Sequence, residues 1–245
     1  MKFLVEAKNL KKNYSSKEAV KDISFNIEQN EILGLLGPNG CGKTTTIGML
    51  LGLLKPSAGE IKIDNMNYEN NRIKILSKIN FISPYIELPK KLTVKQNLIV
   101  YGKLYNIQNL ESRIQYLSEK LRLEDLLDRI TGELSSGQKN RASLAKALIN
   151  KPKVLFLDEP TASLDPEIGD FVRTFLEEYK QENQISILLA SHNMNEVNRL
   201  CKTVLMMKNG IIIDKGTPAA LVDKHGRKNL EEVFLKLSRS EDESY

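Results

Sequence analysis

The sequence predicts an α/β fold with a parallel sheet at its core, an antiparallel β lobe and a helical lobe. Two fully apolar strands, at 154–157 and 185–190, flank a helical segment, a pattern typical of a parallel sheet covered on both faces. Apolar and polar residues alternate near the N-terminus, which favours strands joined by a turn. Leu and Ile recur at three- and four-residue spacing within 92–130, which indicates a separate helical lobe.

The first elements follow from alternation and from Gly and Pro. Alternating residues at 3–7 and 23–27 predict two strands on either side of a polar turn at 13–17, and the apolar run 32–36 predicts a third. A Gly-rich turn follows, and a helix is expected from Lys43 to Leu54.

Lys55-Pro56-Ser57 stops that helix, because Pro cannot continue it. A short strand is expected at 61–63. Further along, a helix from 136 to 150 ends before Pro152. The remaining expected elements are the strand 154–157, a helix near 167–180 and the strand 185–190.

We expect one main domain over 1–228, with its helical lobe at about 85–150. A C-terminal helix and a polar tail, SRSEDESY at the end, would occupy 229–245. The chain contains no internal repeat, so a single copy of each functional motif is expected.

Composition narrows the class without choosing a function. With 41% hydrophobic and 27% charged residues, the chain resembles ordinary soluble proteins. Its net charge of +5 suits nucleotide phosphates, an anionic membrane surface or nucleic acid, and a Lys-rich surface alone explains most of it. Two cysteines, Cys41 and Cys201, make no disulfide framework, so a reducing cytoplasm is expected. No apolar run approaches the ~20 residues of a membrane-spanning helix, and charges near the N-terminus argue against a signal peptide.

A phosphate-binding motif follows the third strand. Residues 37–44, GPNGCGKT, fit G-x-x-x-x-G-K-[ST] between an apolar strand and a helix, the context that the motif requires. Glycines let successive N–H groups point at phosphate oxygens, and the helix N-terminus adds its positive dipole end. Lys43 is expected to reach the β- and γ-phosphates of ATP and Thr44 to ligate Mg²⁺. The full set expected to contact ATP here is Gly37, Pro38, Asn39, Gly40, Cys41, Gly42, Lys43, Thr44 and Thr45.

The motif makes a P-loop NTPase core the expected fold class. A Gly-rich turn without a functional role is the alternative.

Two carboxylates, Asp158 and Glu159, end the apolar strand 154–157. Ligands collect at the carboxyl ends of parallel strands, so both side chains are expected to face the phosphate loop. Asp158 suits a direct or water-mediated Mg²⁺ role, and Glu159 suits the general base or orienter of the attacking water. A surface turn that caps the next segment is the alternative.

Residues 134–138, LSSGQ, resemble the LSGGQ signature of the ABC superfamily of ATPases, although Ser capping of a helix alone would also explain them. The resemblance implies a head-to-tail dimer, in which the signature of one subunit closes over the ATP held by the other. It implies that Ser135, Gly137 and Gln138 contact that ATP, through the Ser135 hydroxyl and the Gly137 N–H group. Ser136 departs from the usual Gly of the signature.

Other stretches carry the same resemblance over nearly the whole chain. Tyr14 resembles the aromatic residue that stacks on adenine, although a lone Tyr before a turn is often only a surface residue. Thr161–Pro166 resembles the D-loop, with Asp165 at the dimer contact. His192 resembles the switch histidine that contacts the γ-phosphate, and is expected to be catalytic together with Glu159; a satisfied polar residue at a strand end is the alternative.

One position departs from the family pattern. The family usually places a Gln near Mg²⁺ and the membrane subunit, but this chain has no Gln between Gln29 and Gln96. Ser83 and Pro84 occupy the corresponding segment. Residues 83–98 and 208–237 resemble ATPase subunits of bacterial exporters whose membrane half is a separate polypeptide.

The resemblance therefore implies ATP hydrolysis that powers a transporter, with ATP and Mg²⁺ as cofactors. A membrane-spanning permease and a second copy of the chain are the expected partners. The expected location is the cytoplasmic face of the cell membrane. The alternatives are a soluble assembly or cell-division ATPase and a nucleic-acid cassette. Residues 45–133 leave no room for a long coiled coil between the phosphate motif and the signature, and no basic–aromatic interleaving indicates a nucleic-acid partner.

Overall fold

The structure is a computed structural model that describes residues 3–15, 17–84, 86–162 and 164–239. It separates into two compact units. The first combines the two ends of the chain, Met1–Ile75 and Ser186–Tyr245, and the second is the continuous stretch Leu76–Ile185. The domain boundaries expected at 85–150 and 228 stay predictions.

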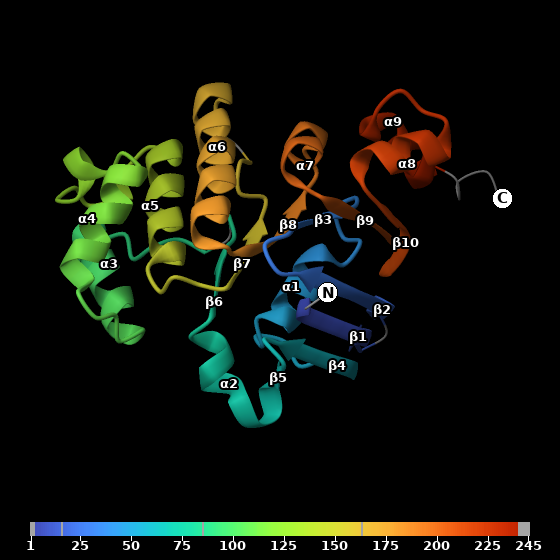
Figure 1. Cartoon of the computed structure of the whole chain (residues 1–245), viewed down its shortest axis with the longest axis horizontal. Helices are drawn as coiled ribbons and strands as arrows, with labels where there is room; N and C mark the ends of the chain where they lie inside the picture. Colours follow the sequence, from blue (N-terminus) through green and yellow to red (C-terminus); the bar gives the residue numbers. More distant parts are fainter. Residues whose placement is uncertain (1–2, 16, 85, 163, 240–245) are drawn as a thin grey trace. The chain divides into compact units, whose positions relative to one another are not determined.

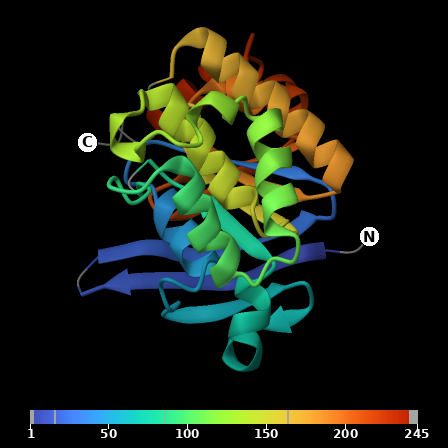
Figure 2. The same ribbon diagram turned by 90° about the vertical axis from the view of Figure 1, so that its left-hand side faces the viewer.

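An antiparallel sheet forms part of the first unit, as the sequence predicts. Its strand order is β2-β1-β4-β5, and Figure 2 shows the two long strands β1 and β2 side by side. Apolar residues face each other across β1 and β2, in the pairs Val5–Ile27 and Ala7–Phe25, and all four are buried. The strands are β1 (Phe3–Tyr14), β2 (Lys17–Glu28), β4 (Ala58–Ile63) and β5 (Met66–Asn67), and α2 (Tyr68–Leu76) follows β5.

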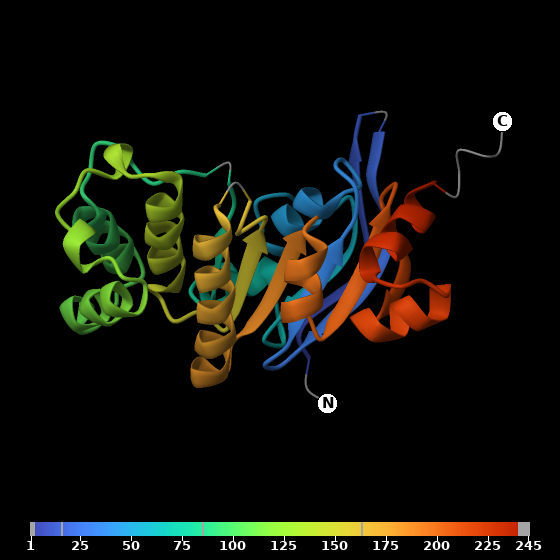
Figure 3. The ribbon, with the colours of Figure 1, turned by 90° about the horizontal axis from the view of Figure 1, so that it is seen from above.

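A mainly parallel sheet forms the core of the same unit. Strand β3 (Ile32–Leu36) lies between β8 (Ser186–Ser191) and β9 (Thr203–Lys208) and is parallel to both. Every residue of β3 and β8 is buried, which explains why these strands read as apolar runs. Helix α1 (Lys43–Leu50) follows β3, and α7 (Met194–Leu200) follows β8 (Figure 3).

The C-terminal helices α8 (Pro218–His225) and α9 (Leu230–Arg239) pack next to the last strand of this sheet. Strand β10 (Ile211–Gly216) pairs antiparallel with β9, and α8 contacts both β10 and α9. Buried Asp214 accepts a hydrogen bond from Lys224 Nζ (2.8 Å) and lies 2.6 Å from His225 Nε2. Helix α9 falls in the segment expected to be helical, whereas tail residues 240–245 lie outside the described part of the chain.

The second unit contains the predicted helical lobe beside two parallel strands. Strands β6 (Ile79–Ile82) and β7 (Val154–Asp158) pair in parallel, and the helices of this unit are labelled in Figure 1. These are α3 (Val94–Leu104), α4 (Leu110–Lys120), α5 (Ser136–Leu148) and α6 (Pro166–Asn183), with 3₁₀ turns η1 (Glu124–Leu126) and η2 (Thr131–Glu133). The α/β class with a parallel sheet, an antiparallel lobe and a helical lobe is confirmed.

Two predicted helices end earlier than the sequence suggests. Helix α1 stops at Leu50 rather than at residue 54, because Gly52 takes a positive φ of 66° and the next two N–H groups turn back to the Gly48 carbonyl. Helix α5 stops at Leu148 rather than at residue 150, because Lys151 takes a positive φ of 48°, its N–H bonds to the Leu148 carbonyl, and Pro152 follows.

None of the described helices is both long enough and apolar enough to span a bilayer.

Gly59 in β4 provides a test of this fold. Its φ is +94°, and a Cβ there would stand 2.5 Å from the Lys8 carbonyl oxygen and closer still to that of Asn9. We expect Gly59→Ala to lower the free energy of unfolding by about 3 kcal/mol, since backbone atoms cannot yield as side chains do. Gly226→Ala is the matched control, because its φ is +59° with no atom near the new Cβ, and it should cost about 1 kcal/mol. Denaturant unfolding followed by circular dichroism measures both, and equal losses would contradict the packing of β4 on β1.

Candidate functional site

The loop that joins β3 to α1 is shaped by two glycines. A Cβ at Gly37 would lie 2.5 Å from Cys41 Sγ and from the Met207 carbonyl oxygen. Gly42 has a φ of +110°, and a Cβ there would lie 2.7 Å from the Ala19 carbonyl oxygen. The loop therefore curls tightly against neighbouring strands, in a path that side chains at these two positions would block.

This loop closes around the Lys43 ammonium. Lys43 is only 6% exposed, and its Nζ donates to the carbonyl oxygens of Gly37 (2.7 Å) and Pro38 (3.2 Å). No side chain caps the N-terminus of α1, because Gly42 occupies the cap position. A fixed positive charge and first-turn N–H groups without a side-chain cap make this a site for an anion.

The other predicted loop residues occupy different depths. Asn39, Gly40 and Thr44 are exposed, Pro38 and Thr45 are half-buried, and Cys41 is buried. Burial raises the pKa of the Cys41 thiol, so it stays neutral and fills space below the loop. Its carbonyl accepts from Gly210 N–H (3.0 Å), which holds the loop to the β9–β10 turn.

His192 leaves the sheet beside this loop. Leu36 pairs with Ser191 in the parallel β3–β8 ladder, so the next residues, Gly37 and His192, emerge at the same edge. The Ser191 hydroxyl donates to Glu196 Oε2 (2.6 Å) and accepts from Asn193 N–H (3.1 Å). The backbone on both sides of His192 is thus held in place.

Glu196 is a buried residue next to the candidate site that sequence reasoning misses. It is fully buried and anchors Ser191, while Asn193 caps α7 by accepting from the N–H groups of Asn195 and Glu196. An Asn cap with Glu three residues later is a helix-start signal that the sequence does contain.

Tyr14 ends β1 in the hairpin whose other strand packs on the loop. It pairs with Lys17, two residues before Ala19, the residue that approaches Gly42. Its side chain is 45% exposed, and Lys12 Nζ lies 5.1 Å from the ring centroid. An exposed aromatic face is available here for stacking, with a cation beside it.

The predicted acidic pair lies at the end of β7 in the second unit. Asp158 is the last residue of the strand and is 3% exposed, and Glu159 follows with a φ of +52°. A non-glycine residue in the left-handed region costs about 1–2 kcal/mol, and such strain concentrates at functional sites. Ile82 pairs with Leu157, so Ser83 emerges next to Asp158 at the same strand ends.

The signature residues and Asp165 lie at the starts of two adjacent helices. Ser135 caps α5 in a capping box with Gln138, through Gln138 N–H to Ser135 Oγ (3.3 Å) and Ser135 N–H to Gln138 Oε1 (3.0 Å). Asp165 caps α6 by accepting from Ile168 N–H (2.9 Å). A Cβ at Gly137 would approach Ile168 within 3.3 Å, so the glycine lets the two helix ends lie close. Ser163, within the same predicted loop, lies outside the described residues.

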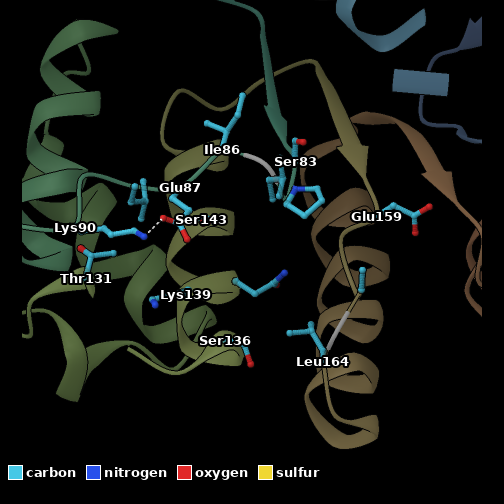
Figure 4. Close-up of a pocket in the computed structure, with 15 residues that line it drawn as sticks. Ser83, Ile86, Glu87, Lys90, Thr131, Ser136, Lys139, Ser143, Glu159 and Leu164 are labelled. Carbon is cyan, nitrogen blue, oxygen red and sulfur yellow. Dashed lines mark ion pairs between the residues drawn. The ribbon is translucent and has the colours of Figure 1, made fainter. Parts of the chain in front are cut away.

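A cavity of about 290 Å³ lies in this unit. Figure 4 shows the side chains that line it. One wall is the segment after β6, with Ser83, Ile86 and Leu88, and another is the N-terminal half of α5. Thr131, Glu159, Ala162 and Leu164 also line it. The Asn140 side-chain amide on α5 donates to the Pro160 carbonyl (2.6 Å), which ties this wall to the segment that carries Glu159. Tyr85, which the sequence analysis places in this stretch, lies outside the described residues.

The residues suit a nucleotide with Mg²⁺ better than a metal held by protein alone. Among the described residues, no three His, Cys, Asp or Glu side chains gather as a metal cluster. The predicted ligands, the Thr44 hydroxyl and the Asp158 carboxylate, are both hard oxygen donors, the kind that Mg²⁺ takes. Mg²⁺ is commonly bound by one or two protein oxygens together with substrate phosphates, so this sparse donor set fits it.

Known proteins similar to this chain are ATP-binding proteins of transporters. The family model described as ABC transporter matches residues 20–162. The ABC transporter ATP-binding protein NatA of Bacillus subtilis is 34% identical over 221 residues, which are 89% of each chain. The Nod factor export ATP-binding protein I of Paraburkholderia xenovorans is 36% identical over 236 residues, which are 94% of this chain and 76% of the relative.

Solved structures with a similar fold are also ATP-binding cassettes. One, the ATP-binding subunit of an ABC transporter, superposes with a TM-score of 0.88 at 27% identity and covers 96% of this chain and 99% of its own. Another, a dimeric cassette in a post-hydrolysis state with ADP and Pi bound, has a TM-score of 0.80 at 25% identity and covers 87% and 98%.

Proposed function

The chain belongs to the ABC transporter family of ATP-binding subunits and is an ATPase, and on that premise we propose that it powers an exporter as a head-to-tail dimer. In that dimer, each ATP would lie between the phosphate loop of one copy and the signature helix of the other. A separate permease at the cytoplasmic face of the membrane would be the partner.

One observation carries the nucleotide assignment. The Gly37–Thr44 loop holds a buried ammonium and a helix start without a side-chain cap, beside His192 at the same sheet edge. This combination suits a chain of phosphates, because the amides and the lysine contact several oxygens at once. Exposed Tyr14 on the adjoining hairpin supplies a face for the base.

The remaining roles follow from side-chain chemistry. Thr44 and Asp158 would hold Mg²⁺, whose charge offsets that developing on the phosphate oxygens during hydrolysis. Glu159 would accept the proton of the attacking water, as a carboxylate within reach of that water can. Ser135 and Gly137 would contact the phosphates held by the second copy, with the Ser135 hydroxyl proton free of the capping bond that its oxygen accepts.

The cavity beside α5 supports a partner in the membrane. Ile86 is 49% exposed, and with Ile82 and Leu88 it gives the cavity apolar walls that suit the apolar face of a short helix. Two relatives are named for export or transporter ATP binding, which favours a permease as that partner. A soluble assembly or cell-division complex is the alternative partner.

We expect Lys43→Ala to abolish nucleotide binding, since Lys43 supplies the buried charge of the loop. Titration with a fluorescent ATP analogue measures the affinity. Lys95→Ala is the matched control, because it removes the same charge from an exposed position on α3 and should bind like the wild type. Wild-type affinity in Lys43→Ala would show that the loop is not used.

We expect Glu159→Gln to bind ATP normally but to lower turnover by ~10²-fold or more, because the amide keeps the shape and cannot accept the proton. Phosphate release under saturating MgATP measures it. Glu167→Gln, at an exposed position in the first turn of α6, should keep wild-type turnover. Unchanged turnover in Glu159→Gln would remove Glu159 from the chemistry.

We expect Pro84→Gln to change the ATPase rate of the isolated chain little and the partner-stimulated rate several-fold. The reason is that residue 84 lines the cavity proposed to receive the partner. Purification from detergent extracts should recover a multi-spanning membrane protein with the tagged chain, and the ATPase assay is run with and without it. A large rise in basal hydrolysis alone would assign the position to Mg²⁺ instead, and recovery of only soluble proteins would favour the soluble-cassette alternative.

A further inference from the structure

Lys146 is a buried cation in the second unit that the proposed chemistry does not use. It lies near the C-terminal end of α5 and is 8% exposed. Its Nζ donates to the Phe81 carbonyl oxygen of β6 (3.0 Å). The same Nζ lies 5.0 Å from the Phe81 ring centroid and 5.7 Å from that of Tyr101 on α3. One ammonium thus joins three elements of this unit.

Among the described residues, the contacts that the Lys146 ammonium makes are with a neutral carbonyl and two rings. Burial is the one influence that shifts its pKa, which it lowers to about 8. Burying a charge costs free energy, and an apolar side chain of similar length would fill the space without that cost. What the lysine adds over an apolar residue is a hydrogen bond to the carbonyl and cation–π contacts with the two rings, which depend on direction.

The position of Lys146 on α5 links it to the cavity of Figure 4. Ser136, Lys139 and Ser143 line that cavity and recur at three- and four-residue spacing along one side of the helix. Lys146 continues the row one turn further. Its acceptor, Phe81, precedes Ile82 and Ser83, which line the facing wall. The contact therefore fastens the two walls together at one end of the cavity.

We propose that Lys146 is a positioning residue, which holds α5 against β6 so that the signature at the start of the helix meets the nucleotide of the second copy in the correct geometry. The inference rests on the proposed head-to-tail dimer. Its charge-assisted bond restrains the helix, whereas Ser135 and Gly137 would make the contact. The rings of Phe81 and Tyr101 restrain the position of the Lys146 ammonium further.

The test measures dimer formation against MgATP concentration by light scattering, with Glu159→Gln as the parent so that ATP is not consumed. Adding Lys146→Met should raise the concentration for half-maximal dimer by roughly 3- to 10-fold, as for partial loss of a charge-assisted hydrogen bond. Lys146→Arg keeps a charge and donors and should stay within about 2-fold of the parent. Binding of a fluorescent ATP analogue to the monomer should be the same in all three, because the phosphate loop belongs to the other unit.

Two readouts separate positioning from a merely structural role. Lys146→Met should unfold at the same temperature as the parent or higher, because replacing a buried charge by an apolar residue is often neutral or stabilising. Raising the pH from 7 to 9 takes Lys146 from roughly nine-tenths to roughly one-tenth charged. The midpoint for dimer formation should therefore rise more in the parent than in Lys146→Arg, which stays charged.

The outcomes distinguish this inference from the function on which it rests. A parent that stays monomeric contradicts the proposed dimer, and the inference falls with it. A parent that dimerises while Lys146→Met matches it leaves the dimer intact and overturns the role of Lys146 alone. Weaker dimerisation in step with a lowered unfolding temperature also overturns it, since the lysine would then only support the fold.

Discussion

The parallel pairing of β3 with β8 is the constraint on which the nucleotide site of the first unit depends. Since Leu36 and Ser191 are paired, the loop after β3 and His192 after β8 must leave the sheet together. The burial of every residue in both strands fixes that register, because these strands cannot shift without breaking a packed core. Because the loop leaves β3 at a fixed point, it curls at Gly37 and Gly42 and encloses Lys43.

In the second unit, parallel strand pairing again brings the predicted site residues together, and the N-termini of two helices contribute further ones. The β6–β7 register brings Ser83 beside Asp158, and the left-handed backbone of Glu159 turns the chain away at once. Ser135 and Asp165 cap their own helices while standing where ligand contacts are proposed. The side chains that cap these helices are thus the ones for which we propose ligand contacts. The Lys146 contact is different, because it places a buried ammonium between α5, β6 and α3, away from the proposed ligand contacts.

Much of this was predictable from local pattern. The apolar strands, the Gly-rich loop and the spacing within 92–130 each carry a strong signal, and the structure places strands and helices there. Helix ends were less predictable: the stop of α1 depends on the backbone of Gly52, and that of α5 on the backbone of Lys151. The partner of Lys146 could not be found from sequence, since the contact needs the folded arrangement of separate elements, whereas the Asn193 cap that places Glu196 is a local signal. The roles of the predicted site residues stay predictions.

The central claim is that each ATP site is shared between two copies, and mixing two inactive chains tests it most directly. One chain carries Lys43→Ala. The other carries Ser135→Asp, which still caps α5 but places a negative charge against the phosphates. A two-fold head-to-tail pair of the two contains one intact site, so mixing should restore ATPase activity, on the order of a quarter of the wild-type rate with random pairing. If the mixture stays as inactive as its components while both chains remain folded, the shared site is contradicted.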